Sequence, residues 1–181
     1  MTDCNERNLS IAVTDCEWVV VEELYPVKNL MEQFNRSNLK VRVLAILSPT
    51  CPDCLHGFEM LKTLLHKFPS DDLSVFLIWI PMLDEDNFEA AIVRSRELSD
   101  SRLMQAWDSS RQIGKLFGKT LNLQKTAWDV YLIYARTESN WEGDEIQSPT
   151  FWMHQLSSDP GADSSLSLNN EVFFRRLSDL L

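Results

Sequence analysis

The chain has 181 residues, of which 44% are hydrophobic and 24% charged, and this is ordinary for one compact domain with a sizeable core. Its 27 acidic and 17 basic side chains give a formal net charge of -10, which argues against nucleic acid and anionic membranes as partners. No stretch approaches the ~18 consecutive apolar residues of a spanning helix, and the first residues lack the pattern of a secretory signal. We therefore expect a cytoplasmic protein, in a compartment where thiols stay reduced.

Predicted strands and helices alternate along the chain. The strands, rich in β-branched and aromatic residues, are expected at residues 16–22, 41–47, 73–80, 129–135 and 150–156. The helices, whose apolar residues recur every three or four positions, are expected at residues 26–34, 52–68, 86–118 and 171–181. The third of these is expected in two or three pieces, with breaks near Ser99 and Asp108. The acidic run from Asp84 to Asp86 is expected to be a solvated helix start.

This order predicts an α/β fold with a central mixed sheet flanked by helices. The last two strands are close enough in sequence to pair as a hairpin, and the helical region of 86–118 is an extended insertion before that hairpin. We expect a single domain over residues 1–181, with a flexible N-terminus at 1–15 and a polar loop at 157–170.

The most informative motif is Cys51-Pro-Asp-Cys54, which lies where the predicted strand 41–47 meets the predicted helix 52–68. At a helix N-terminus, free N–H groups and the positive end of the dipole favour a thiolate, so the pKa of Cys51 should be lowered. Cys54 falls on the same face one turn deeper, which suits a thiol that resolves a mixed disulfide. Asp53 opposes the thiolate, and we therefore expect a modest pKa depression and a reducing or mid-range couple.

Taken together, this motif and the element order resemble the thioredoxin superfamily, in particular bacterial-type thioredoxin-like proteins of unassigned role that carry a CPDC motif. The resemblance implies a thiol–disulfide oxidoreductase in which Cys51 attacks and Cys54 resolves, with no cofactor. Its partners would be a protein or small-molecule disulfide or thiol and a cellular thiol reductant. The expected substrate-binding residues around the dithiol are Thr50, Pro52, Asp53, Trp128 and Asp129.

Three positions depart from that family's pattern. Thr50 stands where thioredoxins have Trp, and Ala45 stands where they bury the acid that accepts the resolving thiol's proton. The family also places a cis-proline opposite the dithiol, whereas residues 125–131 contain no proline, so Trp128 or Asp129 is expected there instead. These departures keep open a second reading, a binding or redox-sensing module without turnover.

Metal binding is a third reading. Copper-delivery members of the superfamily combine a cysteine pair with a distant His, for which His154 is the candidate, although a hydrogen-bonded structural role for that residue is the simpler expectation. Zinc bound by the two cysteines and His56 would fall short of the four ligands of a structural site. A disulfide between Cys4 and Cys16 stays open from the sequence alone.

Overall fold

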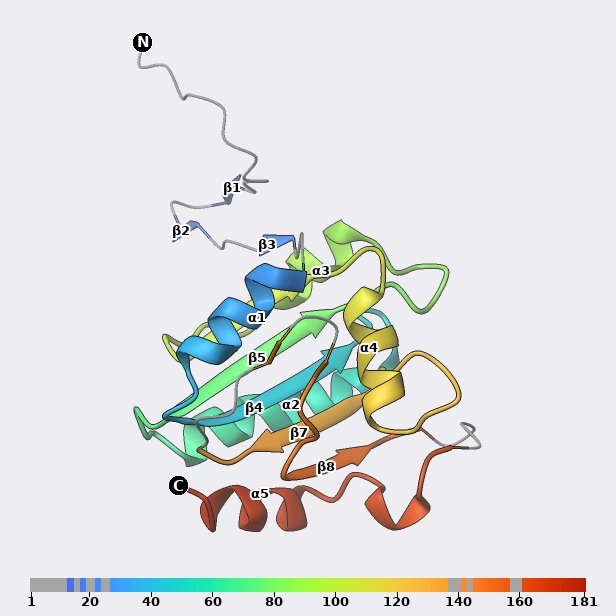
Figure 1. The fold of residues 1–181 in the computed structure, drawn as a ribbon. Helices are drawn as coiled ribbons and strands as arrows, with labels where there is room; N and C mark the ends of the chain where they lie inside the picture. Colours follow the sequence, from blue (N-terminus) through green and yellow to red (C-terminus); the bar gives the residue numbers. More distant parts are fainter. Residues whose placement is uncertain are drawn as a thin grey trace.

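The structure is a computed structural model that describes residues 13–14, 17–18, 22–23, 27–136, 141–142, 145–156 and 161–181. The predictions made for residues 1–12, and for Cys4 and Cys16, lie outside the described residues. Figure 1 shows the arrangement of the elements.

Helices and strands follow the order that the sequence predicts, apart from one additional strand within residues 86–118. The helices are α1 (Val27–Arg36), α2 (Pro52–Lys67), α3 (Phe88–Ser95), α4 (Gln112–Thr120) and α5 (Asn170–Ser178), with a 3₁₀ turn η1 (Ser164–Leu166). The strands are β1 (Val13–Thr14), β2 (Glu17–Trp18), β3 (Glu22–Glu23), β4 (Val41–Leu47), β5 (Leu73–Trp79), β6 (Leu103–Trp107), β7 (Val130–Tyr134) and β8 (Phe151–His154). Of the stretch 157–170 predicted as a polar loop, the described part contains η1 and the first residue of α5.

Six strands form one mixed sheet in the order β3-β6-β5-β4-β7-β8. The first four of these run parallel, β7 is antiparallel to β4, and β8 is antiparallel to β7. The predicted α/β class and terminal hairpin are confirmed. Separately, β1 and β2 pair with each other in a two-stranded antiparallel sheet.

The all-helical insertion predicted for 86–118 is wrong in its middle, because Leu103–Trp107 form the strand β6. This segment contains Leu, Met, Gln and Ala, which have good helix propensity, and no β-branched residue. Pairing with β5 overrides that propensity, since the two strands are in parallel register from Val75 and Leu103 onward. The insertion is thus helix, strand and helix, and it extends the parallel part of the sheet.

Two hydrophobic clusters lie on the two faces of the sheet. On one face α2, α3 and α5 pack against alternate residues of β4 and β5, including Ala45 and Leu77. On the other face α1 and α4 pack against the intervening residues, such as Leu44 and Ile78 (Figure 1). Every residue of β4 and β5 is buried, including Arg42 and Ser74, as the nearly unbroken apolar runs predict. The buried central strands therefore fix the position of the segments that follow their carboxyl ends.

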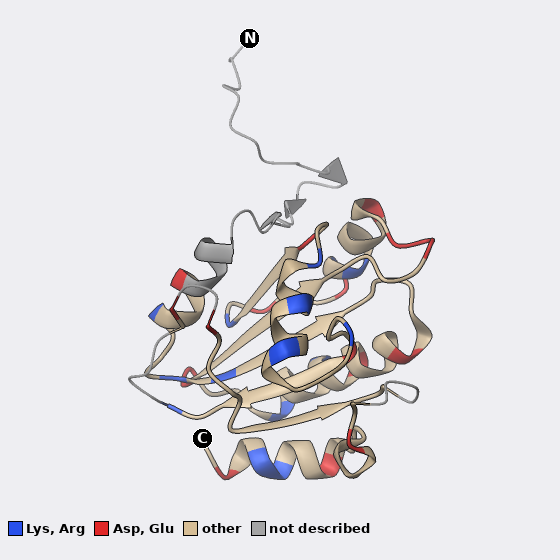
Figure 2. Cartoon of the chain, turned by 45° about the vertical axis from the view of Figure 1, so that its right-hand side comes forward, with Lys and Arg blue, Asp and Glu red and all other residues tan. Residues whose placement is uncertain are grey.

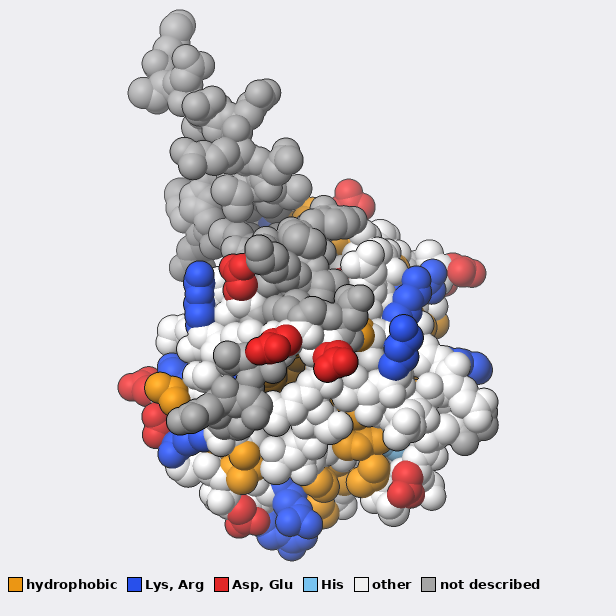
Figure 3. All heavy atoms as spheres, viewed as in Figure 1, with side chains coloured by type: hydrophobic (Ala, Val, Ile, Leu, Met, Phe, Trp, Pro, Cys, Tyr) orange, Lys and Arg blue, Asp and Glu red, His pale blue; other side chains and the backbone are white. Residues whose placement is uncertain are grey.

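The surface carries small hydrophobic patches rather than one broad apolar face in the view of Figure 3, where charged side chains lie between them. Among the described residues, the exposed large hydrophobic side chains are Leu39, Leu83 and Val93, which belong to three different segments. The described part of the chain contains no helix whose length and hydropathy suit a membrane crossing.

Candidate functional site

The cysteine pair lies at the carboxyl end of β4, the parallel strand that borders the antiparallel β7. Cys51 is the N-cap of α2, with φ -72° and ψ 123°, and Pro52 begins the helix, where its missing N–H costs nothing. The Cys51 carbonyl accepts the first helical hydrogen bond, from the N–H of Leu55 (3.0 Å). Strand, turn and helix therefore hold the motif where the sequence places it.

Cys51 is the more acidic thiol of the pair. The pKa of Cys51 is lowered to about 7, first because the Cys54 thiol donates a hydrogen bond to its sulfur, and also because the N–H groups of Asp53 and Cys54 do so. Burial and the charge of Asp129 oppose this shift. Near neutral pH a large share of Cys51 is thus thiolate, which confirms the direction of the sequence prediction.

Cys54 is the opposite kind of thiol. Its side chain is fully buried, and burial raises the pKa of Cys54 well above the ordinary thiol value, with the hydrogen bond to Cys51 adding to the shift. Its sulfur accepts a hydrogen bond from the backbone N–H of Ser48 at 3.3 Å. Both cysteines are free thiols. The pair therefore combines one reactive thiolate with one protonated thiol behind it.

Asp129 faces the pair from the position directly before β7, where the resemblance leads one to expect a proline. Its φ of 53° lies in the left-handed region, which Asp tolerates and which the fixed φ of proline excludes. Both neighbouring strands hold it there: its N–H donates to the Ile46 carbonyl (2.7 Å), and its carbonyl accepts from the Gln155 N–H (3.0 Å). The backbone conformation explains why this chain has no proline here.

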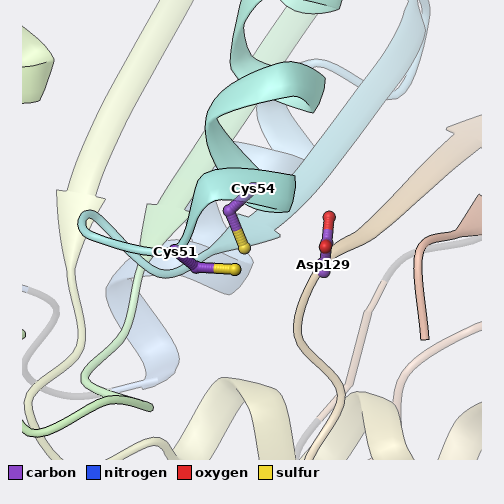
Figure 4. Close-up of side chains that lie close together, drawn as sticks. All are labelled: Cys51, Cys54 and Asp129. Atoms are coloured by element: carbon purple, nitrogen blue, oxygen red, sulfur yellow. The ribbon is translucent and has the colours of Figure 1, made fainter. Parts of the chain in front are cut away.

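The Asp129 carboxylate is buried beside both sulfur atoms. One of its oxygens and the sulfurs of Cys51 and Cys54 all lie within 4.8 Å of one another (Figure 4). Tyr131 donates its hydroxyl hydrogen to Oδ1 of Asp129 (2.6 Å), and the Gln155 amide lies 3.3 and 3.2 Å from the two oxygens. Burial raises the pKa of Asp129, and these two donors only partly offset it. The site is a dithiol with a carboxyl group of increased proton affinity against it.

No family model matches the sequence, and no curated protein matches it. Among solved structures, MTB DsbF superposes with a TM-score of 0.53 and 13% identity, over 79% of this chain and 82% of that one. The sheet order and the dithiol at the turn between β4 and α2 agree with this likeness. The chain has a thioredoxin-like fold.

Two further solved structures are similar at lower scores. A thioredoxin candidate from Neisseria meningitidis has a TM-score of 0.45 and 14% identity, covering 81% of this chain and 84% of its own. A thioredoxin-like protein from Aeropyrum pernix has a TM-score of 0.41 and 14% identity, covering 63% of this chain and 85% of its own.

Within this thioredoxin-like fold, the other residues predicted to bind substrate lie at different depths. Pro52 and Asp53 are exposed on the first turn of α2, and Thr50 is half-buried just before it. Trp128 is half-buried and packs against both hydrophobic clusters, directly before Asp129. All four flank the dithiol or Asp129 in the chain, and their role in binding substrate stays a prediction.

Residues that the sequence analysis did not connect to the site hold the turn before Cys51, residues 48–50. Asp86, predicted to be a solvated helix start, instead accepts five hydrogen bonds, three of them from Ser48 and Thr50 in the turn before Cys51. It lies in the acidic loop between β5 and α3, visible in Figure 2. Arg94 on α3 adds a hydrogen bond to the Pro49 carbonyl (3.2 Å). The only sequence signal for this role of Asp86 is that its carboxylate follows a predicted buried strand.

Gln155 is the other such residue, and it connects the dithiol to a groove. Its amide donates to the Asp53 carbonyl on α2 as well as contacting Asp129. The groove, of about 470 Å³, is open to solvent and runs between His56 and Met60 of α2 and the residues Gln155 and Leu168. A partner bound in this groove would touch the same side chain that holds Asp129.

A metal centre is poorly supported by the described residues. Cys51, Cys54 and Asp129 supply three donor atoms, one fewer than a structural zinc site needs, and His154 is not part of that group. Nδ1 of His154 accepts from the Leu156 N–H (3.0 Å), so Nε2 is the protonated nitrogen that donates to the Asp163 carbonyl (2.9 Å). The hydrogen-bonded structural role expected for His154 is confirmed.

We expect Asp129→Asn to stabilise the fold at neutral pH. Because burial raises the folded-state pKa of Asp129, its contribution to stability is favourable below the unfolded value of 3.8 and is lost as pH rises through the folded value. Asn is uncharged and tolerates the left-handed conformation. Thermal unfolding should show a gain of about 2–4 °C at pH 8, equivalent to about 1 kcal/mol, and almost none at pH 4. A variant less stable than wild type at pH 8 would contradict this account.

Proposed function

We propose that the chain is a thiol–disulfide oxidoreductase that uses Cys51 and Cys54 to reduce or exchange a disulfide of a partner. The observation that carries the proposal is the split in proton affinity between two adjacent thiols, with the pKa of Cys51 lowered to about 7 and that of Cys54 raised by burial. Such a split separates an attacking thiol from a resolving one. The physical causes are the hydrogen bonds that Cys51 accepts from the Cys54 thiol and from the N–H groups of the first helical turn, and the burial of Cys54.

The reaction proceeds in two exchanges. The Cys51 thiolate attacks one sulfur of the partner disulfide, breaks the S–S bond and releases one partner thiolate, leaving a mixed disulfide on Cys51. Cys54 then loses its proton and attacks the Cys51 sulfur, which releases the second partner thiolate and forms the Cys51–Cys54 disulfide. Two electrons pass from the protein to the partner, and a cellular thiol reductant restores the dithiol. The partner is a protein or small-molecule disulfide.

A redox titration tests the proposal. The protein is equilibrated in graded dithiothreitol or glutathione buffers, and alkylated Cys51 and Cys54 are counted by mass spectrometry. We expect a reversible two-electron couple between roughly -270 and -180 mV, the range of working dithiol oxidoreductases. A pair that never closes under these conditions would instead support a binding or redox-sensing module.

Two cysteine variants give a matched test of the two roles. Cys51→Ser should abolish disulfide exchange, because the remaining thiol is buried and protonated at neutral pH. Cys54→Ser should accumulate the mixed disulfide on Cys51, visible as the added mass of a glutathione adduct. If Cys51→Ser retains activity and Cys54→Ser does not, the assigned roles are wrong.

A further inference from the structure

We propose that Asp129 is the catalytic base of the resolving step, the group that takes the proton from Cys54 as it attacks the mixed disulfide on Cys51. This inference rests on the proposed thiol–disulfide exchange and adds a third catalytic residue to it. It assigns a chemical role to a carboxylate that the fold holds in an uncommon backbone conformation beside the two sulfurs.

The resolving step needs a base inside the protein. Cys54 is fully buried, so its thiol has no contact with bulk water to which it could pass a proton directly. Burial also holds its pKa well above the ordinary value, so the fraction that is spontaneously thiolate at neutral pH is very small. A positioned carboxylate removes this barrier by accepting the proton during the attack.

Asp129 is the side chain that can accept it. The groups that face this carboxyl are the two cysteines, Tyr131 on its own strand, the amide of Gln155, and the charge of Asp53 on α2. Cys51 is engaged in the mixed disulfide at this stage, and Tyr131 is a neutral donor whose pKa is raised well above its usual value. Strand β4 offers no acid here, since the residue paired with Tyr131 is Ala45.

The Asp129 carboxylate can accept a further hydrogen bond. Tyr131 donates to Oδ1 at 2.6 Å, and the Gln155 amide lies beyond 3 Å from either oxygen, so of about four lone-pair sites at least one remains for Cys54. Burial raises the pKa of Asp129 and so brings its proton affinity closer to that of a thiol. Its αL backbone, bonded to both neighbouring strands, fixes the group without a loop motion.

Proton and electron pairs balance in this step. The proton of the Cys54 thiol moves to Asp129, and the sulfur's electron pair forms the bond to Cys51 while the bond from Cys51 to the partner breaks. The N–H of Ser48, 3.3 Å from the Cys54 sulfur, stabilises the negative charge as it develops there. The partner leaves as a thiolate, and Asp129 afterwards returns its proton to solvent.

A reaction with 5,5′-dithiobis(2-nitrobenzoate) separates the two exchanges in one trace. The first equivalent of coloured thiolate appears when Cys51 attacks, at a rate proportional to reagent concentration. The second appears when Cys54 resolves the adduct, at a rate independent of that concentration. Cys54→Ser, which should show the first phase alone, assigns the second phase to Cys54.

With Asp129→Asn we expect the second phase at pH 7 to slow by about 100-fold, the lower end of what a positioned base contributes. The first phase should be unchanged or up to about twofold faster, because the lost charge opposed the Cys51 thiolate. In wild type the second-phase rate should rise with pH through the Asp129 pKa and then level, whereas in the variant it should keep rising with hydroxide. The exposed substitution Asp71→Asn is the matched control and should change neither phase.

The experiment distinguishes failure of the proposed function from failure of the role of Asp129. If wild type shows no second phase, the proposed function itself fails, whatever the variant does. If wild type shows both phases and Asp129→Asn keeps the second within about threefold, with an unchanged pH profile, the role of Asp129 is overturned. Should the variant lose the first phase through misfolding, Tyr131→Phe decides: removing that donor should move the inflection of the second phase to higher pH, and an unmoved inflection would contradict the proposal.

Discussion

Replacing Gly57 by Ala is expected to lower the free energy of unfolding by about 2–4 kcal/mol, although Ala is the better helix former. Gly57 lies in α2 one turn after Cys54, and a Cβ added there would lie 1.6 Å from the Tyr131 hydroxyl oxygen and 2.2 Å from the ring carbon that bears it. Tyr131 is fully buried, with its ring 6.5 Å from that of Phe173. The ring must therefore move, which breaks its 2.6 Å hydrogen bond to Asp129.

Two contributions lower the free energy of unfolding of Gly57→Ala, and one partly offsets them. Forcing a methyl into a packed core costs typically 1–3 kcal/mol, leaving the Asp129 carboxylate without its donor costs about as much, and Gly→Ala in a helix returns about 1 kcal/mol. For a chain of this size the midpoint of thermal unfolding should fall by about 4–16 °C. The measurement is denaturant unfolding at pH 7 with both cysteines reduced.

The neighbouring substitution His56→Ala, on the exposed side of the same helix turn, is the matched control and should change stability little. A double-mutant cycle gives the mechanism: in a Tyr131→Ala background, Gly57→Ala should no longer destabilise, because the clashing ring is gone. Equal or greater stability of Gly57→Ala than wild type would show that Tyr131 is free to move and does not fix Asp129 against the helix.

How far the sequence predicts this protein depends on how local each feature is. The turn from β4 to α2, with Cys51 at the cap and Cys54 one turn on, follows from a buried strand pattern, a helical repeat and a proline within a few residues of one another. The direction of the Cys51 pKa shift follows in the same way, since the groups that lower it, Asp53 and Cys54, lie within three residues. These features are predictable from the sequence.

Features that depend on distant residues could not be derived in that way. The segment of β6 has the local propensity of a helix and becomes a strand by pairing with β5. The sequence predicts Asp129 or Trp128 near the dithiol, but the αL conformation of Asp129 depends on hydrogen bonds to the Ile46 carbonyl and from the Gln155 N–H, 83 and 26 positions away in the sequence (129 minus 46 and 155 minus 129). No periodicity carries such information.

Replacing Asp86 is also expected to destabilise the protein strongly, because its carboxylate joins the loop after β4 to the loop after β5. Its Oδ1 accepts from the Ser48 hydroxyl (3.0 Å) and from both the N–H and hydroxyl of Thr50 (3.1 and 2.7 Å). Its Oδ2 accepts from the N–H groups of Met82 and Leu83 (2.7 and 2.8 Å). Removing the carboxylate leaves these donors to water or unpaired, and Asp86→Ala should cost about 2–4 kcal/mol in unfolding free energy.

The same substitution should also expose Cys54. Ser48 donates to the Cys54 sulfur and belongs to the turn that Asp86 holds by hydrogen bonds. In a Cys51→Ser background, Asp86→Ala should raise the rate at which iodoacetamide alkylates Cys54 by at least ~10-fold, because each 1.4 kcal/mol lost from loop closure increases the open population tenfold. Asp84→Ala, at an exposed neighbour in the same loop, should leave that rate unchanged. Equal alkylation rates in the two variants would mean that Asp86 stabilises the fold without closing the loop over the resolving thiol.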